Sequence, residues 1–289
     1  SFNTNLPSIE AANPTKKKFG VANLKEKSLQ FKLLGFDAES DAAQSWVQDN
    51  SISLQTIIQI NGLPGMAPSK LDINAGNLII HPDKIEPLKG DQPIKFNLEK
   101  WQFVGNNWQL LQGSSSISIA SGTIKTGSID VPLTDISLKP DHLSIGNYNV
   151  NNLTLGGIIP VNVVTTKPVF GYNKSVGSDQ KAHYELRLIG ENGKPGVTIK
   201  SLPGMKAGDE MKFQNFSLVS NGEQIINPGN QPNQITFYSV MKVKPLSFTS
   251  GADYVNMDCG IDLNIPQLQE TSGVLQFSKQ GGQMKFMLY

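Results

Sequence analysis

The segment Ile94-Lys95-Phe96-Asn97-Leu98 decides how the chain is interpreted, because apolar and polar residues alternate along it without a break. Period-two alternation is typical of a half-buried β-strand, whose successive side chains point to opposite faces. The same pattern returns in other segments, at 29–33, 52–57, 117–119, 129–131, 184–188 and 235–238. Turn-forming pairs such as Asn61-Gly62 lie between them. Strands recurring at this spacing predict an all-β fold of sandwich or barrel type.

One segment departs from the strand pattern. Ala38, Ala42, Ala43 and Trp46 share a helical spacing, and Asp37 is positioned to cap the first turn. We therefore predict one short helix at residues 38–48.

Four short matches, in the same order in both halves, indicate an internal duplication. They pair Leu63-Pro64-Gly65-Met66 with Leu202-Pro203-Gly204-Met205, 31–35 with 186–190, 92–96 with 231–237, and 127–133 with 260–266. A period of this length is that of a domain and not of a solenoid repeat. Chance similarity among strands rich in Gly, Pro and Asn is the alternative interpretation.

The duplication predicts two tandem β-sandwich domains. Residues 1–26 are polar and irregular, and we interpret them as an N-terminal arm. The first domain is placed at 27–165 and the second at 182–289. Residues 166–181 are predicted to be a linker because they contain Pro168, Gly171 and clustered polar residues.

Composition excludes several classes of protein. The chain has 289 residues, a net charge of +1 and a single arginine, Arg187. Near-neutrality and scarce arginine argue against sequence-specific DNA binding. The one cysteine, Cys259, allows neither an intramolecular disulfide nor a cysteine-based zinc site. No apolar run approaches the length of a membrane span, and the first residues show no signal-peptide pattern.

The sequence offers no catalytic pattern. His81, His142 and His183 are isolated, and neither a HExxH nor a GxSxG sequence is present. A Ser–His–Asp triad assembled in space remains open, but no residue indicates one. We therefore expect no enzyme activity, no cofactor and no metal.

Two sets of residues are candidates for interaction. Lys16, Lys17 and Lys18 form either a solvated stretch of the arm or a contact with an acidic neighbour. Trp101 and Trp108 flank a predicted turn and act either in core packing or as a platform for stacking sugars.

The layout of residues 27–289 resembles that of the double jelly-roll major capsid proteins of icosahedral, membrane-containing bacteriophages. The resemblance is one of architecture. It implies two jelly rolls side by side, a homotrimer that tiles a shell, and assembly into virions in the host cytoplasm. It also implies contacts with copies of the chain and with other virion proteins, and with an internal membrane through Lys16, Lys17 and Lys18 in the arm.

Two alternatives stay open. The first is a tandem β-sandwich adhesin, tail-fibre or carbohydrate-binding module, with Trp101 and Trp108 as exposed anchors. The second is a lipid-transport or envelope scaffold with a β-groove, lined by strands at 153–155 and 158–164.

Overall fold

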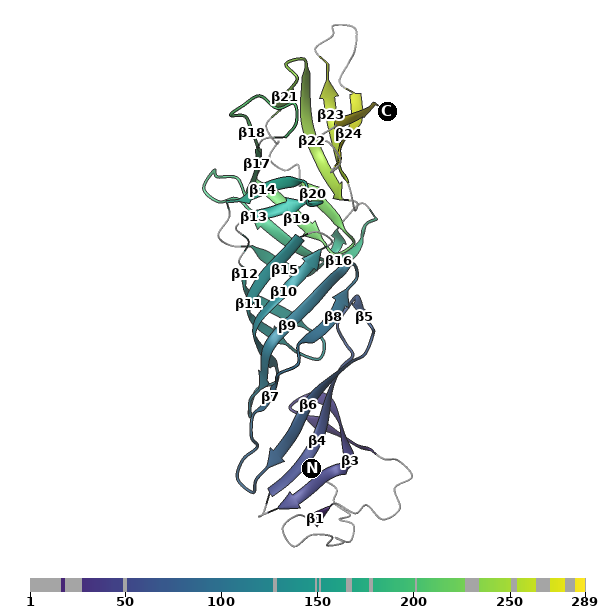
Figure 1. The fold of residues 1–289 in the computed structure, drawn as a ribbon, viewed down its shortest axis with the longest axis vertical. Helices are drawn as coiled ribbons and strands as arrows, with labels where there is room; N and C mark the ends of the chain where they lie inside the picture. Colours follow the sequence, from purple (N-terminus) through teal and green to yellow (C-terminus); the bar gives the residue numbers. More distant parts are fainter. Residues whose placement is uncertain are drawn as a thin grey trace. The chain divides into compact units, whose positions relative to one another are not determined.

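The computed structural model describes residues 17–18, 28–48, 51–126, 129–148, 150, 152–164, 168–176, 179–200, 202–226, 234–250, 254–263, 271–278 and 284–288. The regular elements among these residues are all β-strands, β1 to β25, hydrogen-bonded in several antiparallel sheets (Figure 1). The prediction of an all-β fold is confirmed, and the sheets are consistent with β-sandwich packing.

The first part of the chain forms a five-stranded and a seven-stranded sheet. The five-stranded sheet has the order β1-β3-β4-β6, with β2 also on β3, and its strands are β1 (Lys17–Lys18), β2 (Ser28–Leu33), β3 (Phe36–Gln48), β4 (Ser51–Ile60) and β6 (Leu71–Ile80). The seven-stranded sheet has the order β12-β11-β10-β9-β8-β5, with β7 also on β9, and its strands are β5 (Met66–Ala67), β7 (Leu88–Gly90), β8 (Ile94–Leu98), β9 (Trp101–Leu110), β10 (Ile117–Thr126), β11 (Ile129–Leu138) and β12 (Leu143–Tyr148).

The later part forms a four-stranded and a nine-stranded sheet. The four-stranded sheet has the order β13-β14-β17-β18, and its strands are β13 (Asn152–Leu155), β14 (Ile159–Val163), β17 (Val197–Lys200) and β18 (Glu210–Phe213). The nine-stranded sheet has the order β15-β16-β19-β20-β22-β23-β24-β25, with β21 also on β22, and its strands are β15 (Val169–Val176), β16 (Lys181–Ile189), β19 (Asn215–Val219), β20 (Glu223–Ile226), β21 (Ile235–Phe237), β22 (Met241–Ser250), β23 (Tyr254–Asp262), β24 (Thr271–Ser278) and β25 (Met284–Leu288).

The alternation in β8 is seen directly in the burial of its side chains. Ile94, Phe96 and Leu98 are buried, and Lys95 and Asn97 are exposed. The Phe96 ring stacks on that of Phe103, with 4.8 Å between ring centroids. Burying one such side chain contributes about 1.5–3 kcal/mol, so this face of the strand drives its docking.

The predicted helix at 38–48 is wrong, because these residues belong to strand β3. Ala38 lies opposite Phe31 of β2 on one side and opposite Ile58 of β4 on the other. Phe36, Ala38 and Ser40 are buried in alternation, which is the pattern of a strand. Pairing on both edges outweighs the local helix preference of alanine, since strand formation depends strongly on context.

The chain divides into two compact units at boundaries that differ from those predicted. Unit 1 comprises Ser1–Phe96, Phe103–Gly122 and Thr134–Asn147, and unit 2 comprises Asn97–Gln102, Thr123–Leu133 and Tyr148–Tyr289. The region predicted as a linker, 166–181, contains strand β15 and falls in unit 2. Its Gly and polar residues are compatible with β15 because this strand pairs only with β16 among the described strands, and an edge strand tolerates such residues.

A six-strand arrangement occurs twice along the chain. In the first instance, β9 pairs with β7 near its end and with β8, and then continues through β10 and β11 to β12. In the second, β22 pairs with β20 near its end and with β21 at its start, and then continues through β23 and β24 to β25. Both central strands, β9 and β22, have ten residues. This repeated topology supports the predicted duplication.

Two of the four sequence matches occupy corresponding places in this repeat. Ile94-Lys95-Phe96 lies in β8, and Ile235-Thr236-Phe237 forms β21. The two Leu-Pro-Gly-Met segments form turns, and the residue that ends each turn pairs with the matching strand: β5, which begins at Met66, is beside β8, and Met205 bridges to Phe237. By contrast, the match of 127–133 with 260–266 joins β11 to β23, which are not equivalent in the topology.

Candidate functional site

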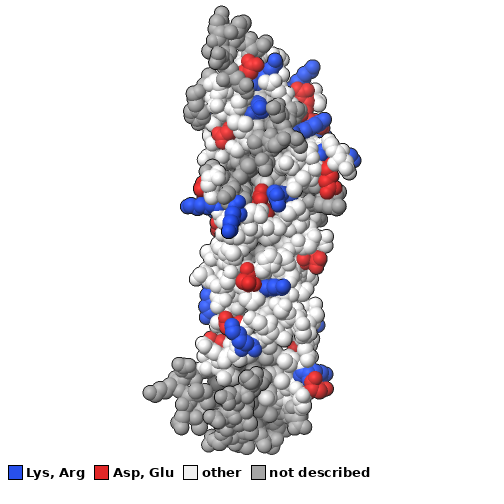
Figure 2. All heavy atoms as spheres, turned by 180° about the vertical axis from the view of Figure 1, so that it is seen from behind, with Lys and Arg blue, Asp and Glu red and all other residues white. Residues whose placement is uncertain are grey.

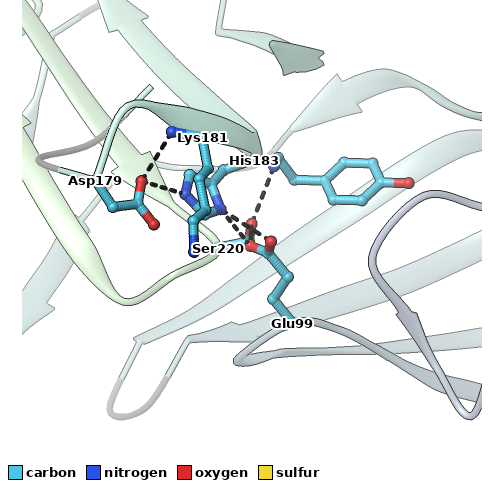
Figure 3. A network of polar contacts seen from close by, with 6 residues as sticks. Glu99, Asp179, Lys181, His183 and Ser220 are labelled. Carbon is cyan, nitrogen blue, oxygen red and sulfur yellow. Dashed lines mark hydrogen bonds and ion pairs between the residues drawn. The ribbon is translucent and has the colours of Figure 1, made fainter. Parts of the chain in front are cut away.

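Polar side chains that are distant in sequence meet inside unit 2 (Figure 3). Glu99 lies in the turn between β8 and β9, and Asp179 lies in the turn before β16. His183 belongs to β16, and Ser220 directly follows β19. We call these four residues the histidine clamp. The antiparallel neighbours β16 and β19 bring the last two together, since the Ser220 N–H donates to the Tyr184 carbonyl over 2.9 Å.

Both turns of the clamp have unusual backbones, and the N–H group of a neighbouring residue holds each turn by a hydrogen bond. Glu99 has a φ of +54°, and Gln180, next to Asp179, has a φ of +58°. A left-handed conformation costs a non-glycine residue about 1–2 kcal/mol, so it persists where the surroundings hold it. The Lys100 N–H donates to the Ser220 carbonyl over 3.0 Å, and the Lys181 N–H donates to Asp179 Oδ1 over 3.0 Å.

The His183 ring is held between two carboxylates. Its Nδ1 lies 2.9 Å from each oxygen of Glu99, and its Nε2 lies 2.8 Å from Asp179 Oδ1. The residue is 5% exposed. Both ring nitrogens donate at once only in the protonated imidazolium. Desolvation alone would lower the pKa of His183, but the hydrogen bonds to Asp179 and Glu99 outweigh it and raise the pKa above its ordinary 6.5. The hydrogen bond between His183 and Asp179, together with the one from the Lys181 amide, lowers the pKa of Asp179.

Ser220 is part of the clamp but is not arranged as a nucleophile. Its buried hydroxyl donates to the Glu99 carboxylate and accepts the Tyr184 N–H over 3.0 Å. A catalytic serine donates to a histidine that acts as a base. Here both nitrogens of His183 are bonded to carboxylates. The arrangement therefore holds charge and positions two turns, and it does not form the triad that the sequence left open.

A buried carboxylate, Glu185, lies on the same face of β16 as His183. Glu185 accepts a hydrogen bond of 2.6 Å from the Ser217 hydroxyl and one of 2.7 Å from the Asn173 side chain. Arg187 Nε lies 3.5 Å from Glu185 Oε2. His183, Glu185 and Arg187 thus form a polar row along one strand, and the chain's single arginine lies beside an internal acid.

The tryptophans are buried, as the core-packing interpretation predicts and contrary to the exposed anchors that the binding-module alternative requires. Trp101 and Trp108 are each 2% exposed. The Trp108 indole N–H donates to the Gln92 carbonyl over 3.1 Å, and its ring lies so close to Gly90 that a Cβ there would clash. The two residues are seven positions apart in β9, so strict alternation would place them on opposite faces. Two successive exposed residues between them, Asn106 and Asn107, shift the alternation, and Asn107 has a φ of +54°. Both rings are therefore buried.

Two of the three lysines predicted to make contacts through the N-terminal arm are among the described residues. Lys17 and Lys18 form strand β1, paired with Val47 and Trp46 of β3, in place of an irregular segment. Pairing with an available strand edge satisfies backbone groups that an extended polar segment otherwise leaves to water. Lys16 lies outside the described residues.

The remaining candidates do not assemble into a site. Cys259 is buried in β23, its thiol donates to the Gly273 carbonyl over 3.6 Å, and burial raises its pKa to about 12. A thiol in that state is a poor nucleophile. His81 pairs with Glu86 at 2.8 Å, partly exposed, and His142 is exposed. On the face in Figure 2, basic and acidic side chains are intermingled.

The fold and the clamp define an all-β protein whose most distinctive polar feature is a buried histidine between two acids. No protein-family model, curated protein or solved structure matches the chain. Within the described part, no helix has the length and hydrophobicity to cross a membrane, and no group of three or more His, Cys, Asp or Glu side chains is placed to hold a metal ion.

The clamp shows which functional candidates sequence reasoning missed. His183 was recognised only as an isolated histidine, and Asp179 and Ser220 were not singled out. The one local signal is that Asp179 and His183 are four residues apart. This spacing brings two side chains together on a helix, and here a turn followed by a strand does the same. The other contacts join residues 84 and 121 positions apart, where no local pattern operates.

Proposed function

We propose that the chain is a structural protein of a virus shell that associates with copies of itself as a trimer. The observation that carries the proposal is the set of open antiparallel sheets. Among the described strands, β12 pairs only with β11, and β15 pairs only with β16. An edge strand presents unpaired N–H and C=O groups, which are a template for another chain.

The exposed side chains of edge strand β15 favour contact with a neighbour. Val169 is 41% exposed and Tyr172 is 42% exposed. Tyrosine and other large apolar residues are enriched where proteins bury surface on association. The net charge of +1 and the intermingled charges in Figure 2 give packed copies little mutual repulsion.

The two alternative functions have less support. Carbohydrate binding through stacking relied on Trp101 and Trp108, and these rings are in the core. A lipid groove relied on the strands at 153–155 and 158–164. Four apolar side chains of β13 and β14 are buried within the fold: Leu153, Leu155, Ile159 and Val161.

Native mass spectrometry and light scattering over a rising protein concentration test the proposal. We expect a trimer that persists on dilution, and larger assemblies at high concentration. A monomer at every concentration would falsify self-association, and absence of the chain from purified particles of its source would exclude the virion.

Matched lysine substitutions test the role of the β15 edge. We expect Val169→Lys to shift the trimer towards monomer, because a charged edge residue opposes strand pairing. Leu246→Lys is the control: Leu246 is 44% exposed, but it lies in β22, which has partners on both sides. Equal behaviour of the two variants would remove β15 from the interface.

A further inference from the structure

The clamp fastens the β8–β9 turn, which belongs to unit 2, to other elements of the same unit. The Glu99 carboxylate accepts from His183 and from the Ser220 hydroxyl, and the Lys100 N–H donates to the Ser220 carbonyl. On the other side of the same ring, Asp179 accepts from Nε2. One imidazole thus holds two turns that are 80 residues apart in the sequence, since the turns carry Glu99 and Asp179.

The arrangement depends on how many protons the ring carries. The imidazolium donates from both nitrogens, whereas the neutral ring has one donor and one acceptor. In the neutral form, a lone pair on one nitrogen therefore faces a carboxylate oxygen at 2.8 or 2.9 Å. Two acceptors at that distance repel, so one of the two carboxylates has to move away.

We propose that His183 is a proton-controlled latch: the protonated ring fastens the Glu99–Lys100 turn and the Asp179 turn together, and loss of its proton releases one of them. The latch is a property of unit 2 and does not depend on the proposed virion function.

The charges around the ring favour this behaviour. Glu99 faces it from the β8–β9 turn and Asp179 from the β15–β16 turn, with Lys181 next to Asp179. Asn173 of β15 lies opposite His183, and its amide donates to Glu185, which shares the ring's face of β16. Ser220, after β19, contributes a hydroxyl to Glu99. Tyr184, next to His183 in β16, lies near enough to Glu99 for its phenol to be affected by that charge. Removing the proton leaves Glu99 and Asp179 without the cation between them.

The direction of the pH effect follows from the two pKa shifts. The pKa of His183 is raised in the folded state, so its stabilisation is complete below the ordinary value of 6.5 and is lost as the pH rises through the folded value. The pKa of Asp179 is lowered, so its contribution is present above 3.8 and is lost only as the pH falls through the lowered value. The latch is therefore closed in mildly acidic solution and opens towards alkaline pH.

Hydrogen exchange and histidine NMR on the full chain test the latch together. The chain has only three histidines, so selective ¹⁵N-histidine labelling reports His183 once His81→Gln and His142→Gln have assigned the other two. We expect His183 to titrate above pH 6.5. We also expect the protection of the Lys100 amide, corrected for intrinsic exchange, to be lost through the same titration, because its hydrogen bond to the Ser220 carbonyl opens when the turn is released.

Variants separate the latch from general stability. His183→Gln should give low Lys100 protection at all pH values, and Glu99→Gln should remove the pH dependence while keeping a hydrogen-bond acceptor. His81→Gln, which removes the partly exposed pair with Glu86, should behave as the wild type. If His183→Gln does not fold, the pH dependence of Lys100 protection in the wild-type protein tests the proposal without it. Protection at Lys100 that stays constant while His183 titrates overturns the proposal, and so does a His183 that titrates below its ordinary value.

Discussion

The β8–β9 and β21–β22 hairpins occupy corresponding places in the repeated topology, but their turns have different uses. In the first, the strand continues past Phe96 to Leu98, and the turn carries Glu99 to His183. In the second, the strand stops at Phe237, and the turn at 238–240 comes earlier.

The earlier turn brings Tyr238 back onto the second Leu-Pro-Gly-Met segment. The Tyr238 N–H donates to the Gly204 carbonyl over 2.8 Å, and a Cβ on Gly204 would come within 2.5 Å of the tyrosine ring. Gly65, the equivalent glycine, is exposed. The two copies of the duplicated framework thus keep the same strand pairing and differ at a hairpin turn. The first strand of one hairpin is two residues longer, and this difference decides which part of the protein its turn contacts.

The largest expected effect is shared by the two hairpins. Phe96→Ala and Phe237→Ala should each lower the free energy of unfolding by about 3–5 kcal/mol, because both rings are buried and a cavity remains. Segment-resolved hydrogen exchange measures the loss in unit 1 and unit 2 separately. A loss of stability below about 1 kcal/mol for one of the two variants would show that Phe96 and Phe237 are not equivalent positions.

The leucines that begin the two turns should come next. Leu63→Ala and Leu202→Ala each remove a buried side chain and should cost about 2–5 kcal/mol in urea unfolding. Ser69→Ala, at an exposed position soon after the first turn, is the control and should change stability by less than about 0.5 kcal/mol.

The glycines should distinguish the hairpins. Gly65 and Gly204 have φ values of +63° and +86°, so either alanine substitution should cost about 1–2 kcal/mol. Gly204→Ala should cost about 1 kcal/mol more, because its methyl group displaces the Tyr238 ring. In the Tyr238→Ala background this excess should disappear, and a double-mutant cycle measures it. An excess that survives in that background contradicts the packing explanation.

The smallest expected effect is a gain in stability. Tyr238 and Ser239 both have positive φ, and Val240 donates back to Phe237, as in a type I′ turn that favours Asn-Gly. Ser239→Gly should therefore raise the unfolding free energy by up to about 1 kcal/mol. Ser114→Gly, in a loop where the serine hydroxyl bonds Ser116, is the contrasting change and should not stabilise. A thermal melt that shows no gain for Ser239→Gly means that the turn is not strained.

Much of the fold followed from local pattern, and the exception is informative. Alternation identified β8 and β21 because each has one buried face. The segment at 38–48 failed because its alanines favour a helix locally, and only the pairing of β3 with both β2 and β4 makes it a strand. The repeated Leu-Pro-Gly-Met segments were recognised as matching sequences, and both form turns, since Pro and Gly encode their backbone directly.

The clamp could not be found in this way. Its members come from two turns, a strand and the end of another strand, and their meeting depends on the pairing of β16 with β19. Trp101 and Trp108 show the opposite difficulty. Gly105, Asn106 and Asn107 between them indicated a turn, but β9 runs through this segment, and a shift of the alternation within it leaves both rings buried.

The buried Cys259 allows local opening of the fold to be measured in the unmodified protein. It is the chain's single thiol, and it lies between β22 and β24, opposite Pro245 and Gly273. A thiol reagent can reach the buried side chain only when the protein around it opens locally, so the labelling rate of the unmodified protein reports that opening. Followed from mildly acidic to alkaline pH, and corrected for thiolate fraction, that rate tells whether release of a turn at one place loosens a distant part of the same unit.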